Sequence, residues 1–325
     1  MPRQDDHELA ELAARLSNAG RWGPDDELGT LNHITPDKRV QAAGLVREGI
    51  VVSLSHPLLA QRDGAGEHHI ERRMHYNRAP DPVSGTPPAA GDHFGIEVHQ
   101  QGVTHLDCVS HIGSVDGRAY NGRHFEEIAR DDGLTFGSVY AQRNGIVSRG
   151  VLLDVAAAAG VDWLDPPHEI LPEELEAAER HADIEVTTGD VVVVRAGVDA
   201  REAALGRHPL VPGPGAAVAR WLHDREVAVY TGDAPEHITT AGARILGRLA
   251  PDADAESDVP DAGAYPLPFH QVAIPAMGLV LLDHARVEEL ARTCRELSRH
   301  EFLFVAAPLV IPGGSGSPVN PLAVF

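Results

Sequence analysis

The 325-residue chain is short of several residue types, and each shortage excludes a class of chemistry. Lys38 is the only lysine and lies in a helical context, which leaves little room for a Schiff-base mechanism. The two cysteines, Cys108 and Cys294, lie far apart and outside any recognisable nucleophile motif, and no Gly-x-Ser-x-Gly elbow occurs. Catalysis by a serine or cysteine nucleophile is therefore not expected.

Long apolar runs are also missing. No stretch approaches the roughly 18 apolar residues that a membrane span requires. The N-terminal sequence MPRQDDHELAELAARL lacks the basic-then-apolar order of a secretory signal and is typical of a short amphipathic helix. We therefore expect a cytoplasmic protein with free thiols and no membrane partner.

Positive charge is scarce. The chain has 27 lysines and arginines against 48 aspartates and glutamates, which gives a formal net charge of −21. Such a chain cannot neutralise a run of phosphates, so we expect no nucleic-acid partner. The acidic residues are spread along the chain, which indicates solubility rather than a binding tail. A small-molecule substrate remains the expected partner.

The chain shows no internal repeat and no low-complexity linker. Residues 1–45 form a helical and turn-rich N-terminal extension, and residues 46–325 form one domain in which short apolar runs alternate with helical segments. This alternation predicts an α/β fold, a single domain with a mixed, largely buried β-sheet or barrel-like core flanked by helices. Residues 60–93 lack periodicity and predict a long surface excursion, either a lid or a disordered flap. Its segment EHHIERRMHY suggests a substrate-anion clamp or a solvated flap.

One short stretch concentrates coordinating side chains. EVHQQGVTHLDCVSH, residues 97–111, has three histidines, two glutamines and an aspartate. In an extended strand alternate side chains share a face, and His99, Gln101, His105 and Asp107 all have odd numbers. An imidazole and a carboxylate two residues apart can reach one cation, and this donor set suits zinc or manganese. The alternative is a row of polar residues on an exposed edge strand.

The same stretch resembles the signature of a known family. QGVTHLDCVSH is similar to H-x-G-T-H-x-D-x-P-x-H of the cyclase family, metal-dependent hydrolases that include bacterial kynurenine formamidase and isatin hydrolase. SLSHPL, TGDAPEHI, LPFHQVAIPAMGLVLLD and the C-terminal FLFVAAPLVIPGGSGSPVNPLAVF extend the resemblance over roughly residues 50 to 325. The resemblance implies a fold of the swivelling β/β/α type and a homo-oligomer, a dimer or tetramer.

The resemblance also implies a ligand set for a divalent metal, Zn²⁺ or Mn²⁺. It puts Gln101 at the first ligand position, followed by His105 and Asp107. His270 falls at the later histidine ligand, and Asp283 falls near a later glutamate ligand, after a one-residue insertion. It leaves open whether there are one or two metals, because Asp283 is one methylene shorter than glutamate.

Three positions depart from the family pattern or have two interpretations. Gln101 stands where the family has histidine, so His99 is the alternative ligand. Cys108 and Val109 replace the usual alanine and proline. The resemblance implies that His111 is the catalytic acid/base, and the alternative is a histidine that caps the following loop.

Two further residues are candidates for substrate binding. Asp233 follows a predicted strand, where α/β proteins place working residues, but it is equally typical of a turn. Trp22 lies in a turn-dense stretch, and its side chain either lines a pocket or packs in the core.

The predicted function is a metal-dependent hydrolase of a small amide, lactam, lactone or N-formyl arylamine, with His111 acting on a metal-activated water. The alternatives are a metal-dependent lyase or cyclase that acts through an enolate, and a catalytically lapsed small-molecule-binding protein. The sequence does not separate them.

Overall fold

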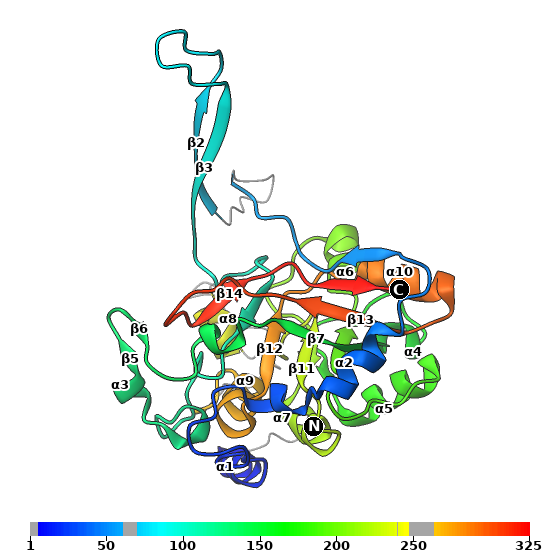
Figure 1. Cartoon of the computed structure of the whole chain (residues 1–325). Helices are drawn as coiled ribbons and strands as arrows, with labels where there is room; N and C mark the ends of the chain where they lie inside the picture. The colour runs from blue at the N-terminus through cyan, green and yellow to red at the C-terminus, as the bar shows by residue number, and fades with distance from the viewer. Residues whose placement is uncertain (1–5, 61–69, 239, 247–262) are drawn as a thin grey trace.

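The computed structural model describes residues 6–60, 70–238, 240–246 and 263–325. A curled sheet of nine strands forms the centre, in the order β1-β15-β13-β7-β9-β11-β12-β4-β14 (Figure 1). The strands are β1 (Val51–Ser53), β4 (His105–Asp107), β7 (Ile146–Asp154), β9 (Val191–Arg195), β11 (Val229–Gly232), β12 (Val280–Asp283), β13 (Glu301–Ala306), β14 (Gly316–Pro318) and β15 (Leu322–Val324). The four central strands, β7 to β12 in the sheet order, run parallel, and the outer pairs are antiparallel. The predicted single α/β domain with a mixed sheet is confirmed.

Helices and small sheets surround this sheet. The helices are α1 (Asp6–Arg15), α2 (Pro36–Ala43), α3 (Phe125–Ile128), α4 (Val155–Ala158), α5 (Pro172–Ala182), α6 (Val198–Leu205), α7 (Ala216–Asp224), α8 (Thr240–Ile245), α9 (Pro268–Val272) and α10 (Glu288–Leu297). Two short pairs are β5 (Ala129–Arg130) with β6 (Gly133–Leu134), and β8 (Glu169–Ile170) with β10 (Gly213–Pro214). Within the described residues, every helix is too short or too polar to span a bilayer.

The sequence VVVVR of β9 explains why the sheet is buried on both faces. All five residues of this strand are buried. Successive side chains of a strand point to opposite faces, so Val192 and Val194 join one apolar cluster while Val191 and Val193 join the other. The first cluster also takes side chains from α1, α5, α7 and α9, and the second takes side chains from α10. Helix α1, from the expected extension 1–45, therefore packs into the core.

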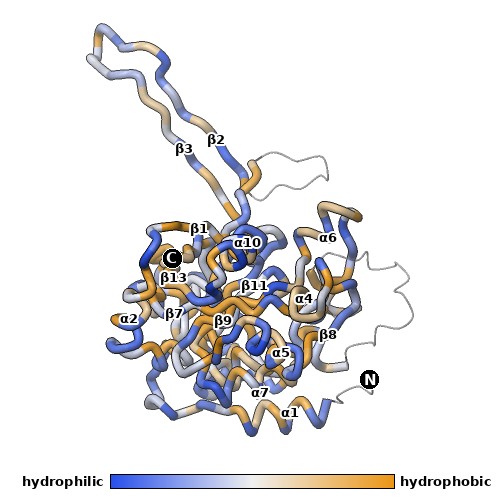
Figure 2. The backbone as a smooth tube through the Cα atoms, turned by 90° about the vertical axis from the view of Figure 1, so that its right-hand side faces the viewer, coloured by the Kyte–Doolittle hydropathy of each residue, from blue (hydrophilic) through white to orange (hydrophobic). Residues whose placement is uncertain are grey.

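A hairpin projects from this body. β2 (Ile70–Asn77) pairs with β3 (Ala89–Ile96) in antiparallel register, and both views show the pair standing away from the remaining elements (Figures 1 and 2). The expected surface excursion is therefore a paired hairpin over these residues rather than a disordered flap. Both strands are exposed, and Arg72 and Asp92 interrupt their apolar residues, so the sequence shows no apolar periodicity strong enough to indicate them. His68 and His69, from the suggested anion clamp, lie outside the described residues.

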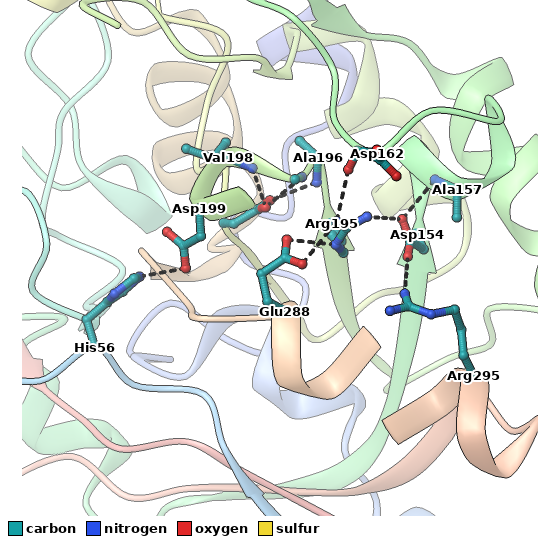
Figure 3. A network of polar contacts seen from close by, with 12 residues as sticks. His56, Asp154, Ala157, Asp162, Arg195, Ala196, Val198, Asp199, Glu288 and Arg295 are labelled. Carbon is teal, nitrogen blue, oxygen red and sulfur yellow. Dashed lines mark hydrogen bonds and ion pairs between the residues drawn. The ribbon is translucent and has the colours of Figure 1, made fainter. Parts of the chain in front are cut away.

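Buried ion pairs fix the carboxyl ends of the central strands (Figure 3). Arg195 ends β9 and donates from Nη1 to Asp154 Oδ1 at 2.9 Å, which connects it to the end of β7. Its Nε and Nη2 donate to the two carboxylate oxygens of Glu288 at 2.9 and 3.0 Å, and Nη2 also reaches the carbonyl of Asp162. A two-pronged contact of this kind holds the guanidinium in one orientation. The network therefore ties two parallel strands to the start of α10.

Asp199 lies beside this network and makes the free energy of unfolding depend on pH. Its Oδ2 lies 3.6 Å from His56 Nε2 (Figure 3). Burial, with Glu202 and Glu288 nearby and Arg286 opposing them, raises the pKa of Asp199 to about 6. The folded state then binds this proton more tightly than the unfolded state, so its stabilising effect is present below pH 4 and is lost as pH rises through about 6.

Asp199→Asn should remove this dependence. We expect a gain of about 1 to 2 kcal/mol at pH 8, after allowance for partial exposure, and little change at pH 4. Urea unfolding at both pH values measures the difference. Asp224→Asn, at an exposed acid, is the control. Equal gains at the two pH values would contradict the assignment of the effect to Asp199 titration.

A candidate metal centre on strand β4

Two neighbouring strands bring the predicted ligands together. β4 lies between β12 and β14, with His105 opposite Asp283 and Asp107 opposite Gly316. Residues directly opposite in an antiparallel pair share a face, and so do residues two apart on one strand. His105, Asp107 and Asp283 therefore project to the same side of the sheet. Asp283 also ends a parallel strand, the edge where α/β sheets hold their ligands.

Asp107 is at the centre of the group. Its side chain is 1% exposed, and neither carboxylate oxygen has a hydrogen-bond partner among the described residues. Oδ1 lies 3.0 Å from His99 Nδ1, without hydrogen-bond geometry, and 3.5 Å from His105 Nε2. Oδ2 lies 3.8 Å from His270 Nε2. Two ligands of a tetrahedral zinc ion are about 3.4 Å apart, given bonds of about 2.1 Å, so these separations fit donors that share a cation.

The charges fit the same interpretation. Burial works to raise the pKa of Asp107, but the imidazoles of His111, His99 and His105 hold it far below the ordinary value. Asp107 is therefore an anion in a buried place, where a carboxylate is costly unless it is paired or coordinates a metal. Asp283 Oδ1 is a further buried oxygen without a hydrogen-bond partner in the described part of the chain.

Hydrogen bonds orient two of the imidazoles toward this point. His105 Nδ1 lies 2.8 Å from the carbonyl of Val103, and because a carbonyl only accepts, the proton is on Nδ1 and Nε2 is left with a lone pair. His270 Nδ1 lies 2.7 Å from Glu236 Oε2, while its Nε2 lies 3.2 Å from Asp283 Oδ2. A partner on the far nitrogen that fixes the ring and its tautomer is typical of metal-binding histidines.

Glu236 is a functional candidate that the sequence interpretation missed. It is 1% exposed, and its Oε1 also accepts from the amide of Phe269 at 2.6 Å. The residue stands in TGDAPEHI, three positions after Asp233, but the chain separates it from His270 by 34 positions. Nothing in the local sequence indicates which histidine it would contact.

Glu236→Gln should weaken metal binding. An amide oxygen can replace only one of the two carboxylate acceptors, so either His270 or Phe269 loses its partner. We expect a loss of about 10- to 100-fold in zinc affinity, measured by competition with a chromophoric chelator. Glu296→Gln, at an exposed glutamate, should change nothing. Unaltered affinity in the Glu236 variant would mean that Glu236 only holds the Phe269 amide.

The structure brings His99, and not Gln101, to Asp107. The amide Nε2 of Gln101 donates to the carbonyl of Leu246 at 3.0 Å. The alternation expected for residues 99 to 107 fails because residues 98–102 form a turn, with Gly102 at φ +73°, and only residues 105–107 are a strand. The geometry thus favours the alternative ligand over the predicted one.

Two donor groups share Asp107. His99, Asp107 and His111 have ligand atoms within 4.8 Å of one another, and so do His105, Asp107 and Asp283. The rings of His99 and His111 are stacked, with centroids 3.8 Å apart. Burial lowers the pKa of His111 to about 4, so its imidazole is neutral at physiological pH. A neutral ring can bind a cation or accept a proton, and both roles for His111 are chemically open.

The two predicted substrate-binding residues have structural partners. Asp233 is 6% exposed, and its carboxylate accepts from the backbone amides of residues 196–198 at 2.8 to 2.9 Å. It therefore orders the start of α6 and does not offer a free oxygen to a substrate. Trp22 packs edge-to-face on His33, with centroids 5.1 Å apart, against an apolar cluster. Both placements favour the structural alternatives.

Two surface cavities of about 420 and 560 Å³ are lined by other residues and include none of the candidate ligands.

Comparisons with known proteins agree with this fold. The model of the putative cyclase family matches residues 52–237. A crystal structure described as a novel cyclase is 28% identical, with a TM-score of 0.75 over 95% of this chain and 99% of that one. Isatin hydrolase A from Labrenzia aggregata, bound to benzyl benzoate, is 20% identical with a TM-score of 0.51, over 87% of this chain and 94% of its own. A further isatin hydrolase, bound to the product analogue thioisatinate, is 18% identical with a TM-score of 0.52 over the same shares. The comparison with curated proteins gave no match.

The likeness to the isatin hydrolases concerns the fold. The family match covers more than half of the chain, and it includes β4 with His105 and Asp107. The structure described as a novel cyclase extends the agreement over nearly the whole chain. The chain therefore belongs to the putative cyclase family.

Proposed function

We propose that the protein is a metal-dependent hydrolase of a small amide, lactam, lactone or N-formyl arylamine. The observation that carries the proposal is Asp107, a buried carboxylate whose oxygens lack hydrogen bonds to described residues while imidazole nitrogens stand 3.0 to 3.8 Å away. Such a carboxylate is stable when a cation completes its surroundings.

The residues present fit a divalent cation. His105 Nε2, the carboxylates of Asp107 and Asp283, and His270 Nε2 would hold one ion, and His99 belongs to the adjoining group. Imidazole and carboxylate donors suit zinc and manganese alike. Such an ion lowers the pKa of a coordinated water toward neutrality and polarises a substrate carbonyl.

The remaining chemistry belongs to the chain. His111 is neutral and adjoins Asp107, so it can accept the proton of the attacking water and pass it to the leaving nitrogen or oxygen. Glu236 holds the His270 ring in place, and the Val103 carbonyl does the same for His105. Fixed ligands of this kind keep the reacting groups in one arrangement.

The test combines metal content with a substrate panel. Protein purified without added metal is analysed for zinc and manganese, stripped with a chelator and reloaded. We expect stoichiometric metal, a melting temperature that rises on reloading, and hydrolysis of a member of a panel of formanilides, lactams and lactones. The panel includes isatin, because two structures with a similar fold are isatin hydrolases.

Oxygen-18 water separates the rival reactions. A hydrolase incorporates the label into product, whereas a lyase or cyclase that works through an enolate does not. Protein without metal, and without a shift in melting temperature when metal is added, would favour a catalytically lapsed binding protein and overturn the proposal.

A further inference from the structure

The cavity of about 420 Å³, called the side cavity below, has the size of a small-molecule site. It lies between residues 27–39 of the N-terminal extension and residues 140–145, which precede β7. Sites for small molecules measure about 300 to 1,000 Å³ and are mostly apolar, with a few polar groups that orient the ligand. The apolar part of this lining is supplied by Leu28, Leu31 and Ile34.

Gln142 gives the side cavity a hydrogen-bond acceptor without a partner. The side chain lines the cavity, is 2% exposed, and donates from Nε2 to the backbone carbonyl of Asp107 at 3.3 Å. A carbonyl only accepts, so this contact fixes which end of the amide is the nitrogen. The other end, Oε1, is buried and has no hydrogen-bond partner among the described residues. A buried acceptor left unpaired is costly, so Oε1 favours an occupant that brings an N–H or O–H group.

Two arginines stand at the same cavity. Arg39 and Arg143 line it and are exposed, and neither forms an ion pair within the part of the chain that the structure describes. The guanidinium of Arg143 lies over the ring of Tyr140, 4.6 Å from its centroid, and Nη1 donates to the carbonyl of the same residue at 3.1 Å. These contacts hold one cation at the wall, where it can meet an anionic group.

The charges of the lining favour an anion. Glu27 is the single acid among the described lining residues, and its Oε2 already accepts from the amide of Gly137 at 2.6 Å. Two arginines against one glutamate leave the lining with a net positive charge, although the whole chain has a charge of −21. Salt screens charges that lie beyond about 8 Å at physiological ionic strength, so the lining has the larger effect on a bound group.

The charged and the hydrogen-bonding groups lie at different depths, because the arginines are exposed whereas Gln142 is buried. We propose that the side cavity binds a small organic acid. Its carboxylate lies at Arg39 and Arg143, its apolar body packs on Leu31 and Ile34, and an N–H or O–H group at its far end donates to Gln142 Oε1. This inference is independent of the proposed activity, since no candidate metal ligand lines the cavity.

Titration calorimetry with 4-hydroxybenzoate tests the proposal. This probe joins a carboxylate and a hydroxyl group through an apolar ring, benzoate lacks the hydroxyl, and 4-hydroxybenzamide lacks the charge. We expect one site per chain, with about 5- to 10-fold weaker binding of either analogue. Treatment with a chelator should leave the affinity unchanged. No binding at millimolar concentration, equal binding of the three compounds, or loss of binding on metal removal overturns the proposal.

Variants locate the bound probe in the side cavity. Arg39→Gln and Arg143→Gln should each weaken 4-hydroxybenzoate binding about 5- to 10-fold. Arg220→Gln, at an exposed arginine of α7 outside the lining, is the matched control and should keep the wild-type affinity.

Gln142→Met removes the acceptor and keeps a side chain of similar length. This variant should bind benzoate as the wild type does and lose the preference for 4-hydroxybenzoate. Where it does not fold, the exposed arginine variants and the benzoate comparison carry the test. Wild-type affinity in both arginine variants, an equal loss in Arg220→Gln, or an undiminished preference in a folded Gln142→Met would overturn the site.

Discussion

Asp107→Asn is expected to remove bound metal and catalytic activity together. Both donor groups contain Asp107, so the substitution affects every arrangement of one or two ions that the site can hold. An amide is uncharged and offers one acceptor in place of two. We expect turnover to fall about a thousandfold or more, which corresponds to loss of the several kcal/mol that a metal ion supplies to the transition state. Metal analysis and the rate on the best panel substrate measure the two losses.

The same variant should also lose the stabilisation that a bound metal gives. Both donor groups lose a charged oxygen, so we expect its melting temperature not to rise when metal is added, whereas that of the wild type does. An active variant that retains metal would show that Asp107 is not a ligand.

His111→Ala is expected to keep the metal and lose most of the turnover. Loss of a general acid/base costs about 100- to 10,000-fold in rate, while the donors on β4, β12 and α9 remain in place. Metal content and single-turnover rates are measured on the same preparation. If the metal leaves with the imidazole, His111 is a ligand of the group that it shares with His99 and Asp107.

Gln101→Ala is the matched control for this experiment. The Gln101 amide donates to a backbone carbonyl, so its loss should leave metal content and turnover close to the wild type. A large loss in that variant would restore Gln101 as a ligand and contradict the placement of His99.

Repeating patterns allowed much of the fold to be predicted from the sequence. The first four positions of β9 are all valine, a pattern typical of a sheet covered on both faces, and the helices between the strands carry recognisable starts such as Pro172. The β2–β3 hairpin was missed because almost every residue of its two strands is exposed. On one face Arg72 and Asp92 interrupt the apolar residues, which weakens the alternation that marks a strand.

The site was predictable where one strand holds its residues. His105 and Asp107 lie two positions apart on β4, and alternation alone puts them on one side. Alternation does not extend to Gln101, because a turn at Gly102 precedes the strand and the Gln101 amide donates to the carbonyl of Leu246. Glu236 and its contact with His270 depend on how distant segments meet, which no local pattern records. The backbone partners of Asp233 could not be predicted either, since a turn aspartate and a substrate-binding aspartate look the same in sequence.

The position of β4 in the sheet has a consequence for the order of protein synthesis. β4 has β14 (Gly316–Pro318) as its neighbour on one side, and β1 pairs only with β15 (Leu322–Val324) among the described strands. Both early strands therefore stay unpaired on that side until the ribosome has made partners that lie more than 200 residues later in the chain. Until residues 316–324 have emerged, His105 and Asp107 lie on a strand with an open edge. Loading of the proposed metal should then follow completion of the domain.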